Sequence, residues 1–116
     1  MRTYELTGSA LDWAVAQAES NVRLQYDSRE GLVISNVLGW IPYRPSLAWQ
    51  QGGPIIERCR IDINYNSGAG SWTAYVEGTG WPKLVEKTGP TPLIAAMRCY
   101  VASELGDEVD VPDELL

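Results

Sequence analysis

The sequence predicts an α+β fold, a single-domain layered sandwich in which a small antiparallel sheet packs with an N-terminal and a C-terminal helix. Apolar side chains recur at helical spacing near each end of the chain. Between them, a hairpin is expected over about residues 60–77, because two alternating apolar and polar runs flank a turn rich in glycine and serine. A chain of 116 residues has room for one core. We therefore expect one domain over residues 1–106 and an acidic C-terminal tail over residues 107–116.

The first helix is predicted over about residues 10–19. Ser9 and Asp12 approximate a capping arrangement at its start, where a carboxylate is also favoured. Trp13 falls on a different face from the apolar side chains, so it either packs under a loop or marks a contact between subunits. The residues predicted to face the core are Leu11, Ala14, Val15 and Ala18.

The next part of the chain is predicted to be extended, with less regular strands. Residues 22–27 alternate apolar and polar side chains, whereas residues 32–38 fit either a strand or an irregular loop. Pro42 and Pro45 restrict the backbone between them, so this piece should be extended rather than helical.

A short and interrupted helical region is predicted after these prolines. Ser46 is a suitable cap for a turn that reaches Trp49 or Gln51. The Gly-Gly-Pro sequence of residues 52–54 then breaks this turn or begins a second one, which ends near Cys59.

The C-terminal part of the chain holds the clearest helix. After a short third strand at about residues 83–86, Thr91 is positioned to cap a helix and Pro92 suits its first position. Gly106 is a typical helix end. The helix between them, residues 92–105, is apolar nearly all the way round, so we expect it to be the central buried helix.

The absence of histidine narrows the possible chemistry. Histidine is the commonest general base at neutral pH and the commonest metal ligand, so Ser-His triads and most zinc sites are excluded or weakened. Cys59 and Cys99 are expected to be buried thiols that act as small hydrophobes rather than a disulfide. We expect a non-enzymatic protein with no cofactor and no bound metal.

The formal charge of −6 is concentrated in the tail, where residues 107–116 hold five acids and no base. Such a tail either stays solvated or docks on a partner. Residues 1–106 hold ten acids and nine bases, and this near-neutral body argues against non-specific nucleic-acid binding. No stretch approaches the roughly 18 unbroken apolar residues that span a bilayer, and no signal peptide is recognisable. We therefore expect no membrane association and a cytoplasmic location.

Four residues are predicted to line one ligand-binding site: Tyr43, Arg44, Trp49 and Arg98. The two aromatic rings suit stacking on a flat base-like ring, and Arg44 suits contact with an anion. Alternatively, Trp49 anchors a short helix in the core and Arg44 is solvated. Arg98 lies in an otherwise apolar helix, and three roles are open for it. It clamps a phosphate or carboxylate, it forms a structural salt bridge, or it extends along the apolar surface until its charged end reaches solvent.

Three ordered stretches resemble a known family. LTGSALDWAVAQAE at residues 6–19, WQQGGPIIE at residues 49–57 and GPTPLIAAMRCYVASELGDEVDVPDEL at residues 89–115 are similar to NinX-type proteins of tailed bacteriophages. More distantly, the chain resembles the phage ABA-sandwich proteins. The resemblance implies an accessory phage gene product made in the bacterial host cytoplasm, and a layered α/β fold. It implies no catalytic residues.

These observations lead to two functional hypotheses. In the first, the protein binds a small nucleotide-like ligand and so sequesters an immune signal of the host, as a counter-defence protein. In the second, it is a protein-interaction module that modulates a host or phage enzyme, for which the acidic tail and surplus aromatic residues are the motivation. We expect a homo-oligomer in either case, because small proteins rich in aromatic residues often complete their core across a two-fold interface.

Overall fold

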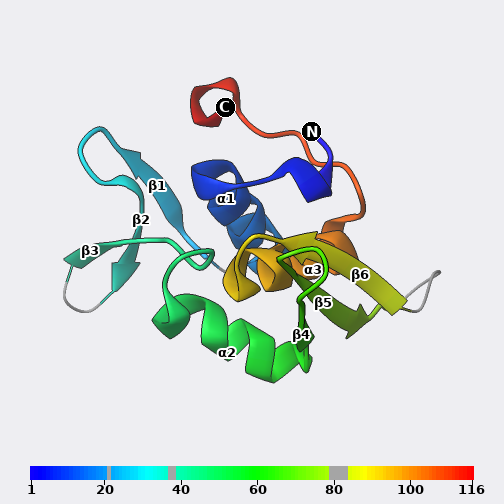
Figure 1. Ribbon diagram of the computed structural model, residues 1–116. Helices are drawn as coiled ribbons and strands as arrows, with labels where there is room; N and C mark the ends of the chain where they lie inside the picture. Colours follow the sequence, from blue (N-terminus) through cyan, green and yellow to red (C-terminus); the bar gives the residue numbers. More distant parts are fainter. Residues whose placement is uncertain (21, 37–38, 79–83) are drawn as a thin grey trace.

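The computed structural model describes residues 1–20, 22–36, 39–78 and 84–116, and its elements follow the predicted order (Figure 1). The helices are α1 (Gly8–Glu19), α2 (Trp49–Cys59) and α3 (Pro92–Leu105), with short 3-10 helices η1 (Thr3–Glu5) and η2 (Asp113–Leu115). The strands are β1 (Leu24–Asp27), β2 (Gly31–Asn36), β3 (Gly39–Pro42), β4 (Asp62–Asn66), β5 (Ser71–Glu77) and β6 (Leu84–Gly89).

The strands form two small antiparallel sheets, ordered β1-β2-β3 and β4-β5-β6. Helix α3 packs against the second sheet and also against α1, while β2 lies against α1 (Figure 1). The predicted α+β layered sandwich is confirmed. The sequence predicted one sheet, built on the β4-β5 hairpin, and β1 to β3 form a second one.

The core is centred on α3. Its apolar side chains are buried on nearly every face, because α1 covers one side of the helix and the β4-β5-β6 sheet covers another. The all-round apolar sequence of this helix predicted that position. Core side chains that meet here include Leu11, Val15, Ala74, Val76, Met97 and Val101.

Both ends of α3 are as predicted. The Thr91 hydroxyl oxygen accepts a hydrogen bond from the Ile94 backbone nitrogen at 3.1 Å, and Pro92 takes the first helical position. Gly106 ends the helix with a φ of 91°, a left-handed value that glycine adopts without steric cost. These signals are local, which is why the sequence alone located this helix.

Helix α2 differs from its prediction. It runs without a break from Trp49 to Cys59 through the Gly-Gly-Pro sequence, and its cap is Ala48 rather than Ser46. Gly52 explains the continuity, because here the helix lies directly against the Pro45 carbonyl oxygen and the Leu93 side chain. A Cβ atom at Gly52 would be 2.6 Å from the Leu93 Cδ2. Tertiary contact therefore holds a helix that the local sequence favours breaking.

Helix α1 begins at Gly8, two residues earlier than predicted, so the predicted cap at Ser9 and Asp12 is wrong. Thr7 takes the cap position without a side-chain hydrogen bond. With Ser9 inside the helix, Asp12 is free to bond elsewhere. It accepts a hydrogen bond from the backbone nitrogen of Ser46.

The strands resolve what the sequence left open. Residues 31–36 form strand β2, and the remainder of the predicted 32–38 segment lies outside the described residues. Extended structure ends at Pro42 in β3, after which residues 44–47 form a turn closed by a hydrogen bond from the Leu47 nitrogen to the Arg44 carbonyl at 3.0 Å. Strand β6 reaches Gly89, three residues beyond its predicted end.

The acidic tail folds back on the domain through contacts with the first residues of the chain (Figure 1). The backbone nitrogen of Thr3 donates to the Asp107 carbonyl at 2.8 Å, and the Val109 nitrogen donates to the Met1 carbonyl at 2.9 Å. The side chain of Val109 is buried, whereas the five acidic residues remain exposed. We call this pairing of residues 1–3 with residues 106–109 the terminal clasp.

Both cysteines are free thiols, as predicted. Cys99 is buried in α3, and this burial raises the pKa of its thiol to about 12, while Cys59 is partly exposed. Within residues 1–20, 22–36, 39–78 and 84–116, no helix combines the length and apolar character required to cross a bilayer.

Candidate functional site

The first three residues of the predicted ligand site have different surroundings. The Tyr43 side chain is buried in the core, and burial together with the nearby Glu19 and Asp12 carboxylates raises the pKa of its hydroxyl group. Arg44 is exposed and donates from Nη2 to the Glu30 carbonyl at 3.3 Å. Trp49 begins α2 with 55% of its surface exposed.

Arg98, the fourth predicted residue, binds backbone carbonyl groups. Its Nε donates to the Leu6 carbonyl at 2.8 Å and its Nη1 to the Thr88 carbonyl at 2.9 Å. Partial burial lowers the pKa of its guanidinium group. Arg98 thus ties the N-terminal segment and the end of β6 to α3.

None of the three pockets described in this section is lined by all four of these residues. Trp49 lines a shallow pocket of about 190 Å³, together with residues of the turn before α2 and the N-terminal end of α3. Tyr43, Arg44 and Arg98 line neither this pocket nor the two described below. The shared site stays a prediction.

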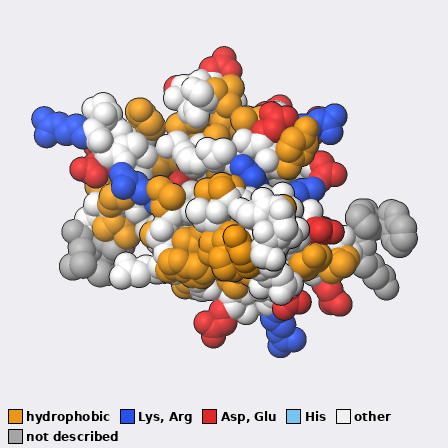
Figure 2. Space-filling view, in the orientation of Figure 1, with side chains coloured by type: hydrophobic (Ala, Val, Ile, Leu, Met, Phe, Trp, Pro, Cys, Tyr) orange, Lys and Arg blue, Asp and Glu red, His pale blue; other side chains and the backbone are white. Residues whose placement is uncertain are grey.

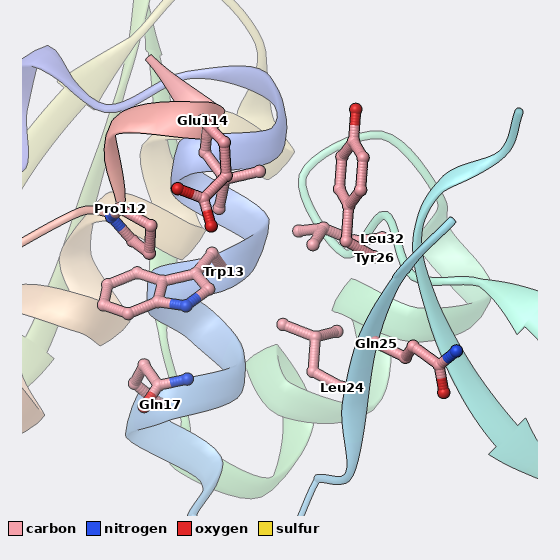
Figure 3. Close-up of a pocket in the computed structure, with 9 residues that line it drawn as sticks. Trp13, Gln17, Leu24, Gln25, Tyr26, Leu32, Pro112 and Glu114 are labelled. Carbon is pink, nitrogen blue, oxygen red and sulfur yellow. The ribbon is translucent and has the colours of Figure 1, made fainter. Parts of the chain in front are cut away.

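One candidate is a pocket of about 210 Å³ between α1, β1 and the tail, which we call the Trp13 pocket (Figure 3). Trp13 and Gln17 project from α1 on one side, Leu24 and Tyr26 lie across from them on β1, and Glu114 lies on the tail (Figure 3). The lining residues are Trp13, Gln17, Leu24, Gln25, Tyr26, Leu32, Pro112, Glu114 and Leu115.

The local structure explains why these residues meet. Trp13 and Gln17 are four residues apart in α1, so they share a face one turn apart. Leu24 and Tyr26 are two residues apart in β1 and point to the same face of the sheet. The third wall, containing Glu114, exists because the terminal clasp turns the tail back over α1.

The pocket is apolar with a few polar groups. Of its nine lining residues, Glu114 alone carries a charge. The Gln17 amide supplies both donors and an acceptor, and the indole N–H of Trp13 is a further donor. Among the residues that the structure describes, no lysine or arginine is paired with Glu114, Asp113 or Asp110.

A second pocket, of about 490 Å³, lies between the end of α2 and the β4-β5-β6 sheet. Its charged groups have mixed signs: Arg60 lies with Asp62 and Glu77. It also contains Cys59, whose thiol pKa is raised by burial, so the reactive thiolate is disfavoured at neutral pH. This combination selects no particular ligand.

A polar cluster joins the three helices at the C-terminal end of α1. Arg58 Nη2 lies 3.0 and 2.9 Å from the two carboxylate oxygens of Glu19, and the Tyr100 hydroxyl donates to the same carboxylate at 3.2 Å. The hydrogen bond to Glu19 raises the pKa of Arg58. The polar groups of this cluster form hydrogen bonds with one another, so their role in joining the helices explains why they are there.

Apolar side chains also gather on the face that carries the starts of α2 and α3 (Figure 2). Leu47 is 63% exposed here, beside the exposed Trp49, and both line the shallow pocket with Pro92 and Leu93. Contiguous exposed apolar groups of this kind often mark an interaction surface. We call the exposed Leu47 and Trp49, together with the partly buried Pro92, the Leu47 patch.

Comparison with known proteins agrees with the resemblance seen in the sequence. A family model described as "Bacteriophage P22, NinX" matches residues 2–104, which is well over half of the chain. The chain belongs to the NinX family. No curated protein matches the sequence.

The sequence contained two signals for the Trp13 pocket of this NinX-family protein. Trp13 lies off the apolar face of α1, and the sequence predicted that it packs under a loop or marks a contact between subunits; in the structure it packs against the core and lines a pocket with residues of the tail. The second signal is Leu115 within the acidic tail. A wholly solvated segment would expose this apolar side chain, and here it lines the pocket.

Proposed function

We propose that this NinX-family chain is a non-enzymatic phage accessory protein that acts in the bacterial cytoplasm by binding another protein through the Trp13 pocket. By this contact it would modulate a host or phage enzyme. The observation that supports the proposal is a side-chain-sized cavity with an aromatic wall, open between α1, β1 and the tail.

The size of the cavity favours a side chain over a whole small ligand. Pockets for drug-sized ligands have volumes of about 300 to 1,000 Å³, and a cavity of about 150 Å³ holds one benzene ring. At about 210 Å³, the Trp13 pocket matches a single inserted side chain and is too small to enclose a nucleotide. Buried side chains that fill such pockets dominate many protein interfaces.

A peptide-display selection against the purified protein tests this function. We expect enriched peptides to bind the wild-type protein and to lose at least about tenfold in affinity to Trp13→Ala, since a central aromatic contact often contributes more than 1.4 kcal/mol. Trp40→Ala is the matched control, because Trp40 is a half-exposed tryptophan that does not line the pocket. Failure to enrich any peptide, or equal losses in both variants, would contradict the proposal.

A small nucleotide-like ligand, sequestered as a host immune signal, is the second candidate. It is supported by the exposed ring of Trp49, which lies beside the N-terminal end of α3 in the Leu47 patch. A tryptophan face stacks on bases, and a helix N-terminus attracts phosphate.

Calorimetry with cyclic dinucleotides and ADP-ribose derivatives tests the second candidate. We expect binding by the wild-type protein and its loss in Trp49→Ala, with Trp40→Ala again as the control. No heat of binding from any member of the panel, with folded protein, would exclude this candidate.

A further inference from the structure

We propose that the Trp13 pocket accepts a cationic side chain, arginine or lysine, from a basic segment of a partner protein. The inference rests on the proposed function and names the chemistry of the partner. It combines three features of the same cavity: its single charge, its aromatic wall and its acidic surroundings.

The charge of the lining favours a cation. Glu114 is the one charged residue among the nine that line the pocket, so an entering anion would meet a carboxylate and no compensating base. A guanidinium or ammonium group would instead form a charge-assisted hydrogen bond with it. Gln17 lies on the α1 side of the pocket (Figure 3), and its amide oxygen can accept a second N–H once the amide turns toward the cation.

The aromatic and apolar residues that line the pocket fit the uncharged part of an arginine or lysine side chain. The indole of Trp13 is the aromatic surface to which cations bind best, and a planar guanidinium also stacks on it. Leu24 and Leu32 supply an apolar wall for the methylene groups of the side chain. A neutral apolar side chain would fill the same space, but it would cover the Glu114 carboxylate without giving that carboxylate a hydrogen-bond partner.

The tail around the opening carries further negative charge. Asp110 and Asp113 are exposed on the same segment as Glu114, while Asp107 is paired with Lys87 at 3.1 Å. Charges at the rim of an interface increase the association rate with a partner of opposite charge. The occupant is therefore a segment with several basic residues, of which one enters the pocket.

Matched octapeptides test the charge requirement. An (Arg-Gly)₄ peptide and its (citrulline-Gly)₄ counterpart have nearly the same shape, but only the first is cationic. We expect the arginine peptide to bind the wild-type protein at least about tenfold more tightly, a difference that corresponds to about 1.4 kcal/mol. Equal affinity of the two peptides would overturn the proposal.

Two acid-to-amide variants locate the site. Glu114→Gln should weaken binding of the arginine peptide by about fivefold or more, because it removes the charge-assisted contact. Glu57→Gln changes the net charge equally on the exposed face of α2, outside the pocket, and should change affinity less than twofold. Equal effects of the two variants would mean that binding depends only on overall charge, which would overturn the assigned site. Circular dichroism confirms that both variants are folded.

Argininamide distinguishes a free small cation from a protein segment. We expect it to compete with the peptide only at concentrations about a hundredfold higher, because it lacks the neighbouring charges. If argininamide binds as tightly as the peptide, the ligand is a small free cation and the partner assignment is wrong. If selected peptides bind through Trp13 but contain no arginine or lysine, this inference fails while the proposed function stands.

Discussion

Asp12 accepts a hydrogen bond from the backbone nitrogen of Ser46 at 2.9 Å, although 34 residues separate them in the chain. Asp12 is 2% exposed in α1, and burial raises the pKa of its carboxyl group to about 6 from an ordinary value of 3.8, against the opposing effect of the Ser46 N–H. The hydroxyl of Ser46 also lies beside this carboxyl but forms no hydrogen bond of good geometry. The contact fixes the turn before α2 on α1.

The burial of Asp12 makes stability depend on pH. Between about pH 4 and pH 6 the folded protein keeps the proton of Asp12 while the unfolded chain loses it, so the stability contributed by the neutral carboxyl is lost as pH rises. The loss should reach at most about 3 kcal/mol, at about 1.4 kcal/mol per pKa unit. Urea unfolding at pH 4 and pH 7 measures it.

Asparagine is the control for the titration. Asp12→Asn keeps an acceptor for the Ser46 N–H and should remove the difference between the two pH values. Asp12→Ala leaves that N–H unpaired and should lower the free energy of unfolding by about 1 to 3 kcal/mol at either pH. Identical pH dependence in the wild type and Asp12→Asn would show that another group titrates.

Adjacent glycines in α2 should respond differently to alanine. A Cβ atom at Gly52 would press on the Pro45 carbonyl oxygen and the Leu93 side chain, so Gly52→Ala should destabilise the protein by about 1 to 3 kcal/mol. At Gly53 the nearest atom outside the chain neighbours and the helix backbone is the Trp49 Cε3 at 3.9 Å, so an added Cβ meets no tertiary clash. The gain in helix propensity is offset because residue 53 precedes Pro54, so Gly53→Ala should change stability by less than about 1 kcal/mol. Thermal unfolding compares the two variants, and an equal or smaller loss in Gly52→Ala would refute this packing of α2.

Replacing Arg98 distinguishes a structural role of its side chain from a role in clamping a ligand. Arg98→Met keeps the length of the side chain but loses the bonds to the Leu6 and Thr88 carbonyls. We expect a loss of about 2 to 3 kcal/mol in the free energy of unfolding, because both bonds come from a charged donor. Arg98→Lys should be intermediate, since one ammonium group does not reproduce the guanidinium fork. Unchanged stability in Arg98→Met would favour a ligand clamp instead.

The terminal clasp should contribute to stability through Val109. Its side chain is buried, so Val109→Ala should lower the free energy of unfolding by about 1.5 kcal/mol, at about 0.8 kcal/mol per buried carbon. Val111→Ala, two residues further along and only partly buried, should have a smaller effect. Guanidinium unfolding measures both, and equal effects would indicate that the clasp is not packed as described.

The predicted homo-oligomer has a candidate interface in the Leu47 patch. If copies associate there, light scattering at micromolar concentration should give a multiple of the chain mass, and Leu47→Lys should reduce it to that of a monomer by placing a charge in an apolar contact. Leu84→Lys, at an exposed leucine outside the patch, is the control. A monomer mass for the wild-type protein would contradict the prediction.

The elements that the sequence predicted well depend on local signals. Thr91, Pro92 and Gly106 define the ends of α3 without reference to any distant residue, and the alternation in β4 and β5 defines the hairpin. Helix α2 was predicted as two pieces because Gly-Gly-Pro is a local break signal. The contact of Gly52 with Pro45 and Leu93 that maintains the helix is visible only in three dimensions.

The candidate site was harder to predict for the same reason. Tyr43 is near Arg44 and Trp49 in sequence, but its ring lies in the core because α1 and α3 come close to it, as the nearby Asp12 and Tyr100 show. The Trp13 pocket joins residues about a hundred positions apart. No pattern within α1 indicates that the tail covers it.

The terminal clasp also bears on how sequences of this family should vary. Thr3 is fully buried, and its hydroxyl donates to the Gly106 carbonyl at 2.8 Å, at the point where the tail leaves α3. A change at residue 3 therefore alters the course of the segment that carries Glu114 to the pocket. In a large set of related chains, the identity of residue 3 should covary with residues 106–109, although they are encoded at opposite ends of this sequence.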